Sequence, residues 1–410
     1  MSVDVLIVGA GPAGLGAASL LGARDLRVVV VDEYPVAGGR LRGQQYRLPD
    51  DRWFIGRERA EDLIQAVAEC PGVSLELGTS VLDIRPDAGE WCVTTATNGV
   101  ARTRRAARCL IATGAVELPL PLKGWTLPGV ITAGGAQTLQ GTWGVRPGRV
   151  GIMVGLTPLA MAVSQELEAA GVHLSGVVMP PALSSTRYLG TPAQQWARLA
   201  AWSRSAPVWA RWGAGALSDT LVRRLVMPRF PRGGLTVSGV RFRLGVGAVE
   251  ILGEEHVEAI RLTRLDGDGH PIGKPWEEPV DFVCLAAGLR PLSDVVGAGG
   301  ALLAHEPRLG GHVPVLDADG RTTQAGLYAA GSAGGVEGAE VAVGQGRLAA
   351  AAILADMGHG PDGYPGTFRG AIGEARRRAP LAFQEGVDEG RKAMEHLWSV
   401  AMAAEADEEA

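Results

Sequence analysis

The sequence contains few cysteines, few aromatic residues and little net charge. Its four cysteines are far apart in a chain of 410 residues, and they form neither a C-x-x-C pair nor a spacing typical of a metal site. Aromatic residues make up only 5% of the chain, and the formal net charge is −5. So small a charge, mixed in sign along the chain, is not typical of proteins that bind nucleic acid. We therefore expect reduced, packed thiols and no nucleic-acid partner.

An apolar stretch at the start of the sequence, residues 3–23, has some features of a signal peptide or a membrane span. It carries Asp4 where a signal peptide has a basic leader, and glycines typical of turns interrupt it. These features predict a cytoplasmic protein whose contact with a membrane is at most peripheral.

Glycine, by contrast, is abundant with 59 residues, and the first glycines follow a nucleotide-binding pattern. A short β-branched run predicts a strand, Gly9, Gly11 and Gly14 follow it, and a small-residue helix and a second strand come next. This context makes the G-x-G-x-x-G spacing a strong indication of a dinucleotide fold. Gly11 would let a pyrophosphate approach the backbone, and the helix N-terminus at Pro12 and Ala13 would favour its negative charge.

An acidic residue ends the second predicted strand, where it would bind the adenosine ribose. Two residues are candidates for this role. Spacing from Gly14 favours Asp32, whereas spacing back from Gly38 favours Glu33. The sequence leaves both open.

Further segments resemble FAD domains of the glutathione reductase type. They are a second glycine pair in "YPVAGGRL" (34–41), the "CLIATGA" segment (109–115) after a predicted β-meander (73–108), and a closing segment (322–352). The resemblance implies bound FAD, and a Rossmann layer without cofactor is the alternative. The implied cofactor contacts in these segments are Gly38, Gly39, Arg40, Val81, Ala112, Thr113, Gly114, Gly331, Ser332, Glu337 and Ala339.

The closing segment departs from this pattern at Ser332, where the superfamily usually has an aspartate that binds a ribitol hydroxyl. A serine hydroxyl makes the same bond without charge assistance, which is worth ~1 kcal/mol rather than about twice that. Glu337 and Glu340 are expected near the flavin edge, where either could tune the flavin. Carboxylates at a helix N-terminus are also commonly just partners of the helix dipole. The catalytic residues therefore remain unknown.

The dinucleotide pattern occurs a second time at residues 148–179, again as strand, turn, helix and strand. Its third glycine position holds Ala160, which the fingerprint tolerates. Its middle position holds Thr157, whose side chain fills the space that a pyrophosphate needs, and the second strand ends in Met179, Pro180 and Pro181 instead of an acid. We therefore predict a degenerate domain in which NAD(P) binding is unlikely.

Residues 124–155, with residues 28–41 and 335–350, closely resemble one group of flavoproteins. This group is the FAD-binding larger subunit of hydrogen cyanide synthase, opine oxidase and dye-linked L-proline dehydrogenase. The resemblance covers nearly the whole chain and is weakest at residues 180–232 and after residue 360. It implies a heteromeric complex with a D-amino-acid-oxidase-like flavoprotein subunit that oxidises the C–N bond of an amino acid, imino acid or opine. A small ferredoxin-like subunit is a further candidate partner.

Many members of this group carry a cysteine-rich segment near the C-terminus for a [2Fe–2S] cluster. Residues 360–410 of this chain contain no cysteine. Because such a cluster needs four ligands, normally thiolates, we expect no iron–sulfur cluster in this chain.

The sequence thus predicts an α/β protein with two Rossmann-like dinucleotide-binding domains of the glutathione reductase type, the second inserted in the first. The FAD-binding domain is expected at residues 1–118 and 286–360, the inserted domain at 119–285, and a helical tail at 361–410. The predicted function is an FAD-containing electron-transfer subunit. A self-sufficient NAD(P)H-dependent flavin oxidoreductase and a cofactor-poor scaffold subunit are the alternatives.

A cluster of tryptophans and arginines occupies residues 190–227. Tryptophan and arginine are enriched in interface hot spots, so this stretch is a candidate docking surface. Aromatic residues that cover the sheet of the second domain explain it equally well, and contact with a membrane surface is a third interpretation. The tryptophans are Trp196, Trp202, Trp209 and Trp212.

Overall fold

The structure is a computed structural model. It describes residues 2–47, 52–180, 182, 220–226, 229, 231, 233–237, 239–361, 363–379 and 383–409. The four tryptophans of the candidate docking surface lie outside the described residues.

The first sheet has seven strands in the order β5-β2-β1-β8-β7-β6, and β21 pairs with β8. Strands β5, β2, β1, β8 and β21 pair in parallel, whereas β6, β7 and β8 form an antiparallel meander. The buried parts of the central strands, at residues 5–8, 28–31 and 109–111, are continuous apolar runs, as expected for strands buried on both faces. The strands are β1 (Ser2–Val8), β2 (Val28–Asp32), β5 (Val73–Leu77), β6 (Thr79–Asp87), β7 (Glu90–Thr97), β8 (Val100–Ile111) and β21 (Leu327–Ala329).

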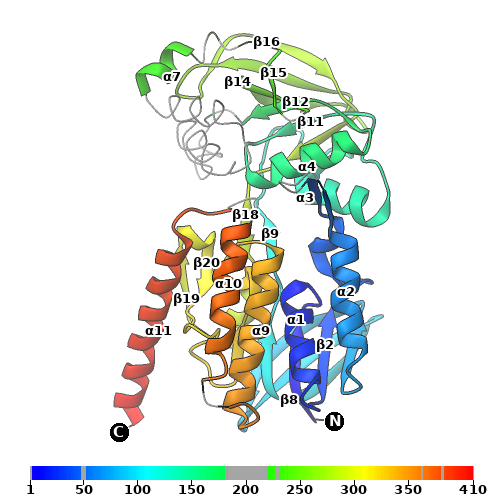
Figure 1. Ribbon diagram of the computed structural model, residues 1–410. Coiled ribbons are helices and arrows are strands. Elements are labelled where there is room, and N and C mark those ends of the chain that lie inside the picture. Colours follow the sequence, from blue (N-terminus) through cyan, green and yellow to red (C-terminus); the bar gives the residue numbers. More distant parts are fainter. Residues whose placement is uncertain are drawn as a thin grey trace.

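Helices α1 (Pro12–Gly22) and α9 (Ala339–Asp356) lie against each other on one face of this sheet, with α10 (Gly366–Arg378) beside α9 (Figure 1). Small residues bring α1 and α9 into backbone contact, because a Cβ on Gly346 would lie 1.9 Å from the carbonyl oxygen of Ala13. An excursion after β2 contains η1 (Gly39–Gly43), β3 (Gln45–Arg47), β4 (Trp53–Ile55) and α2 (Gly56–Ala68).

The second sheet has eight strands in the order β10-β17-β11-β12-β14-β15-β16, and β13 pairs with β14. Strands β10, β17, β11, β12 and β14 pair in parallel, and β14, β15 and β16 pair antiparallel. The elements of this lobe are β10 (Val130–Thr132), α3 (Ala133–Gln137), η2 (Thr138–Thr142), β11 (Val150–Val154), α4 (Pro158–Ala169), β12 (His173–Met179), α7 (Thr220–Val226), β13 (Leu235–Val237), β14 (Val240–Leu252), β15 (Ala259–Leu265), β16 (Pro271–Pro279) and β17 (Phe282–Leu285).

Two antiparallel strands, β9 (Ala115–Glu117) and β18 (Leu289–Pro291), pair at the junction of the two lobes (Figure 1). The chain leaves the first lobe through β9 and returns through β18. In the chain, all strands of the second sheet therefore come before β21, which returns to the first sheet and pairs with β8. The remaining elements after β18 are α8 (Asp294–Ala298), β19 (Leu303–Glu306), η5 (Pro307–Leu309), β20 (Gly311–Pro314), η6 (Gly331–Gly334) and α11 (Val387–Glu409).

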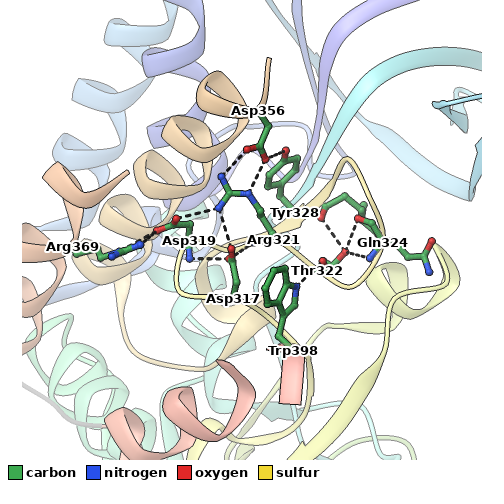
Figure 2. Close-up of polar contacts among 10 residues, drawn as sticks. Asp317, Asp319, Arg321, Thr322, Gln324, Tyr328, Asp356, Arg369 and Trp398 are labelled. Atoms are coloured by element: carbon green, nitrogen blue, oxygen red, sulfur yellow. Dashed lines mark hydrogen bonds and ion pairs between the residues drawn. The ribbon is translucent and has the colours of Figure 1, made fainter. Parts of the chain in front are cut away.

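The C-terminal helices are anchored to the loop before β21 by specific polar contacts (Figure 2). From α10, Arg369 Nη2 lies 2.6 Å from Asp319 Oδ1, and from α11, Trp398 Nε1 donates to the carbonyl oxygen of Thr322 at 3.0 Å. Arg321 of this loop pairs with Asp317 and Asp319 in the same loop and with Asp356 at the end of α9. Among the described helices, none has an apolar stretch sufficient to span a bilayer.

Candidate cofactor site

The first glycine turn has the shape that a dinucleotide phosphate requires. A Cβ on Gly14 would lie 1.8 Å from the carbonyl oxygen of Gly9, so only glycine allows α1 to approach β1 so closely. At Gly11, by contrast, an added Cβ would meet nothing within 4 Å. Gly11 is the N-cap of α1, and no described side chain caps that helix. The N–H groups of Ala13 and Gly14, in the first turn of α1, therefore have no capping side chain among the described residues and are available to a bound phosphate.

The second glycine pair packs against this turn. The N–H of Gly38 donates to the carbonyl oxygen of Ala10 at 2.8 Å, and a Cβ on Gly39 would lie 3.1 Å from the Cα of Gly11. Both glycines have positive φ, +106° and +54°, which explains why this sequence has glycine at both positions. The structure thus brings together two motifs that are well separated in sequence.

Two later segments converge on the same turn. The N–H of Ala112 donates to the carbonyl oxygen of Val8, and the Thr113 hydroxyl donates to that of Leu292 at 2.6 Å. A Cβ on Gly331 would lie 2.8 Å from the Cβ of Ala13, which places the closing segment against α1. The sequence-predicted Gly9, Gly11, Ala13, Gly38, Gly39, Ala112 and Gly331 therefore form one cluster.

Two further glycines near this cluster have free space beside their backbone. An added Cβ would meet nothing within 4 Å at Gly114 or at Gly338. Gly338 is the N-cap of α9, directly before Ala339, and no described side chain caps this helix. Ser332 is partly exposed in η6, next to Gly331 of the cluster. Two uncapped helix N-termini therefore border the candidate site, each able to stabilise negative charge on a ligand.

The two acidic candidates differ in their contacts. Asp32 accepts hydrogen bonds from the N–H of Ala10 at 2.6 Å and of Tyr34 at 2.8 Å. Burial raises the pKa of Asp32, and these two bonds oppose that shift. Glu33 is exposed and makes no hydrogen bond or ion pair with the described residues. Asp32 thus supports the glycine turn, and Glu33 is the carboxylate whose oxygens are all available to a ribose.

The second dinucleotide pattern has kept the turn but not the open helix end. A Cβ on Gly155 would lie 2.1 Å from the carbonyl oxygen of Ala286, as one on Gly9 would lie 2.4 Å from that of Ala112. Thr157, however, is the N-cap of α4, and its hydroxyl accepts a hydrogen bond from the N–H of Ala160 at 3.1 Å. The Thr157 hydroxyl therefore occupies the N–H group of Ala160, which a bound phosphate would need as a donor.

Comparisons with known proteins agree with this geometry. The model of the pyridine nucleotide-disulphide oxidoreductase family matches residues 3–198. The A subunit of opine oxidase from Agrobacterium tumefaciens (strain Ach5) is 32% identical over 373 residues, which are 86% of this chain and 66% of that protein. The corresponding opine oxidase protein of Rhizobium meliloti (strain 1021) is 30% identical over 367 residues, which are 87% of this chain and 71% of that protein.

The chain belongs to the family of these opine oxidase proteins. This confirms the family that the sequence motifs indicated. The crystal structure of L-proline dehydrogenase from P. horikoshii has the same fold, with a TM-score of 0.64 at 24% identity over 91% of this chain and 59% of that chain. The predicted fold class is therefore confirmed as well. The chain spans about two thirds of the length of the opine oxidase proteins it matches.

Two further predicted cofactor contacts, Val81 and Arg40, lie on other elements and stay predictions. Val81 lies on β6 and packs against the core cluster that contains Leu6 and Val31, whereas α1 packs against the cluster that contains Val5. Arg40 is half-exposed, and its Nη1 lies 3.7 Å from Glu117 Oε2 at the lobe junction.

Glu337 is a buried anchor for the C-terminal helices. Its carboxylate accepts from Gln345 Nε2 at 2.7 Å and from Arg391 Nε at 2.9 Å, and it also pairs with Arg376. Burial alone would raise the pKa of Glu337, but the charges of Arg391 and Arg376 hold it below its ordinary value. The ion pairs of Glu337 therefore stabilise the folded protein fully above the ordinary glutamate pKa. This stabilisation is lost as the pH falls through the lower pKa that Glu337 has in the folded protein. Glu340 instead pairs with Arg59 at 2.8 Å.

A second buried carboxylate, which the sequence analysis missed, joins the two lobes. Glu166 on α4 is 4% exposed and accepts hydrogen bonds from the N–H of Gln45 on β3 and from Gln137 Nε2 on α3, at 3.0 and 2.9 to 3.0 Å. Burial raises the pKa of Glu166 to about 8, although these bonds oppose the shift. The helical spacing of α4 marks Glu166 as a buried position, but only the fold shows that it faces the other lobe.

We expect Glu166→Gln to abolish one component of the pH dependence of stability. The folded pKa of about 8 lies above the ordinary glutamate value of 4.5. Folding therefore takes up a proton between these values, and stability falls as the pH rises through this window. The amide keeps the shape and cannot ionise, so the variant should gain on the order of 5 kcal/mol relative to the parent near pH ~8.5 and little near pH ~4.5. Thermal unfolding across this pH range measures the difference.

The matched control is Glu255→Gln, because Glu255 is exposed. That variant should follow the parent at every pH. An unchanged pH profile for Glu166→Gln would show that Glu166 is ionised in the folded protein.

Among the residues that the structure describes, no group of three or more His, Cys, Asp and Glu side chains is arranged to hold a metal ion. Cys92, Cys109 and Cys284 are buried, and Cys70 is partly buried.

Proposed function

We propose that this chain is the FAD-containing electron-transfer subunit of a heteromeric amino-acid, imino-acid or opine dehydrogenase or oxidase complex. The observation that carries the proposal is the contrast between the two helix N-termini. The N-terminus of α1 at Gly11 is uncapped and open, whereas that of α4 is capped by Thr157. One dinucleotide site is thus shaped for a cofactor, and the other is not.

The residues around the open site fit FAD in its usual extended form. Gly11, with the N–H groups of α1, would hold the pyrophosphate, and Glu33 would bind the adenosine ribose. Ser332 would bind the ribitol, and the N-terminus of α9 at Gly338 would face the pyrimidine edge of the flavin. FAD supplies hydride and single-electron transfer when it is bound. The protein residues would bind and orient it. In our proposal the opposite lobe, where Thr157 caps α4, binds no nicotinamide cofactor.

The partner would carry the substrate chemistry. The relatives are named as subunits of opine oxidase. By resemblance, the partner is a D-amino-acid-oxidase-like flavoprotein that oxidises the C–N bond, and a small ferredoxin-like subunit would carry electrons onward. We place the complex in the cytoplasm. The amino acid or opine that is oxidised would be selected by the partner.

The proposal is tested by identifying what the purified chain binds. The full chain is expressed, the protein is denatured, and the released nucleotide is identified by chromatography and mass spectrometry. We expect FAD in an amount equal to the chain. A chain without flavin would instead support a cofactor-poor scaffold subunit.

A further inference from the structure

A cavity of about 370 Å³ lies between the loop before β21 and the helices α9, α10 and α11. Its size falls within the range of pockets for small ligands. Apolar side chains line part of it, among them Leu316, Leu348, Ile372 and Met394. Its wall includes Gly331, one residue before Ser332, so it lies behind the closing segment of the candidate cofactor site.

The charged lining of this cavity is balanced, with four acidic and four basic side chains. Such a balance gives no net attraction for a simple anion or a simple cation. It suits a ligand that carries both charges, provided that one group of each sign is available to it.

Most of these charged groups already have partners that fix their positions. Asp319 pairs with Arg369 at 2.6 Å, as Figure 2 shows, and Asp388 pairs with Arg376 at 3.1 Å. Arg391 donates to the buried Glu337. These pairs form a rigid polar wall.

Lys392 and Glu395 differ from the others. They lie one turn apart on α11, and both line the cavity. The charge of Glu395 raises the pKa of Arg376, yet the side chains of Lys392 and Glu395 make no hydrogen bond or ion pair with the part of the chain that the structure describes. Lys392 is exposed at the mouth, and Glu395 is partly buried. One cation and one anion are therefore available to the same ligand, beside an apolar surface.

We propose that this cavity binds a zwitterionic amino acid with an apolar side chain. Lys392 would bind the α-carboxylate, Glu395 would accept hydrogen bonds from the α-ammonium, and Leu316, Ile372 and Met394 would contact the side chain. The inference does not rest on the proposed electron-transfer role, because none of these residues belongs to the glycine turns.

Calorimetry with the full chain tests the proposal. The probes are L-leucine, L-methionine and L-phenylalanine, together with 4-methylpentanoate, which lacks the ammonium, and 3-methylbutylamine, which lacks the carboxylate. We expect saturable binding of at least one amino acid. Binding of both leucine analogues should be weaker by at least about tenfold than that of leucine, because each leaves one charged group of the cavity unpaired.

Two variants assign the binding to this cavity. Lys392→Met and Glu395→Gln should each weaken amino-acid binding by about tenfold or more, whereas Lys274→Met, an exposed lysine on β16, should leave it unchanged. Flavin content, measured on the same samples, should be equal in all of them. The proposal is overturned if none of the three amino acids binds, if both cavity variants bind as the parent does, or if 4-methylpentanoate binds as tightly as leucine.

Discussion

A Gly11→Val variant should fold normally and lose its flavin. In the protein without cofactor, a Cβ at this position meets nothing within 4 Å, and the backbone has φ −80° and ψ −173°, which valine adopts readily. The added side chain would occupy the space above the N-terminus of α1 that the pyrophosphate needs. We expect affinity for FAD to fall on the order of 100-fold or more. Absorbance of the purified protein and fluorescence of released flavin measure the loss.

The matched control is Gly370→Val, because Gly370 also has open space around it but lies on α10. That variant should keep its flavin. Thermal unfolding of both variants in the absence of added flavin should be close to that of the parent chain without flavin. Normal flavin content in Gly11→Val would refute the assignment of the site.

Glu337→Leu should destabilise the C-terminal helices strongly. The carboxylate is 8% exposed and pairs with Arg376 on α10 and Arg391 on α11, so its loss leaves two partly buried guanidinium groups without their acid. Removing one partner of a buried ion pair typically costs about 3–5 kcal/mol. Because Gly338, the N-cap of α9, follows Glu337 directly, we also expect weaker flavin retention.

Thermal unfolding and limited trypsin digestion measure this effect, since Arg376, Arg377 and Arg378 end α10. Digestion of α10 should be faster in the variant than in the parent. Glu374→Leu is the control, because Glu374 also pairs with arginines of α10 but on an exposed surface, where ion pairs contribute little. If both variants resist trypsin equally, Glu337 does not anchor the tail.

The first glycine turn could be predicted from sequence because the conformation of the turn requires glycine at fixed spacings. Gly14 packs against the backbone of Gly9 within the same turn, and Gly9 has a positive φ of +109°, so the pattern itself encodes both requirements. The degenerate second turn could also be predicted, since Thr157 breaks the pattern. What spacing could not show is that the Thr157 hydroxyl caps α4, because a cap depends on the rotamer of the side chain and the start of the helix.

The contacts of Glu337 and Glu166 could not be predicted for a different reason. Glu337 is 39 and 54 residues from the arginines that bind it, and Glu166 is 121 residues from Gln45. Such pairs depend on how the lobes and the tail come together. The same limit applies to the cavity on α11, whose walls come from separate segments of the chain.

We propose that electrons reach this flavin from a partner chain and not from NAD(P)H bound at the second turn. The most direct test is anaerobic addition of NADH, and then of NADPH, to the purified flavin-containing chain while its absorbance is followed. Our account predicts a yellow protein that stays oxidised with both nucleotides and bleaches with dithionite. Rapid bleaching by either nucleotide would contradict it, because it would show that Thr157 is tolerated and that the chain is a self-sufficient reductase.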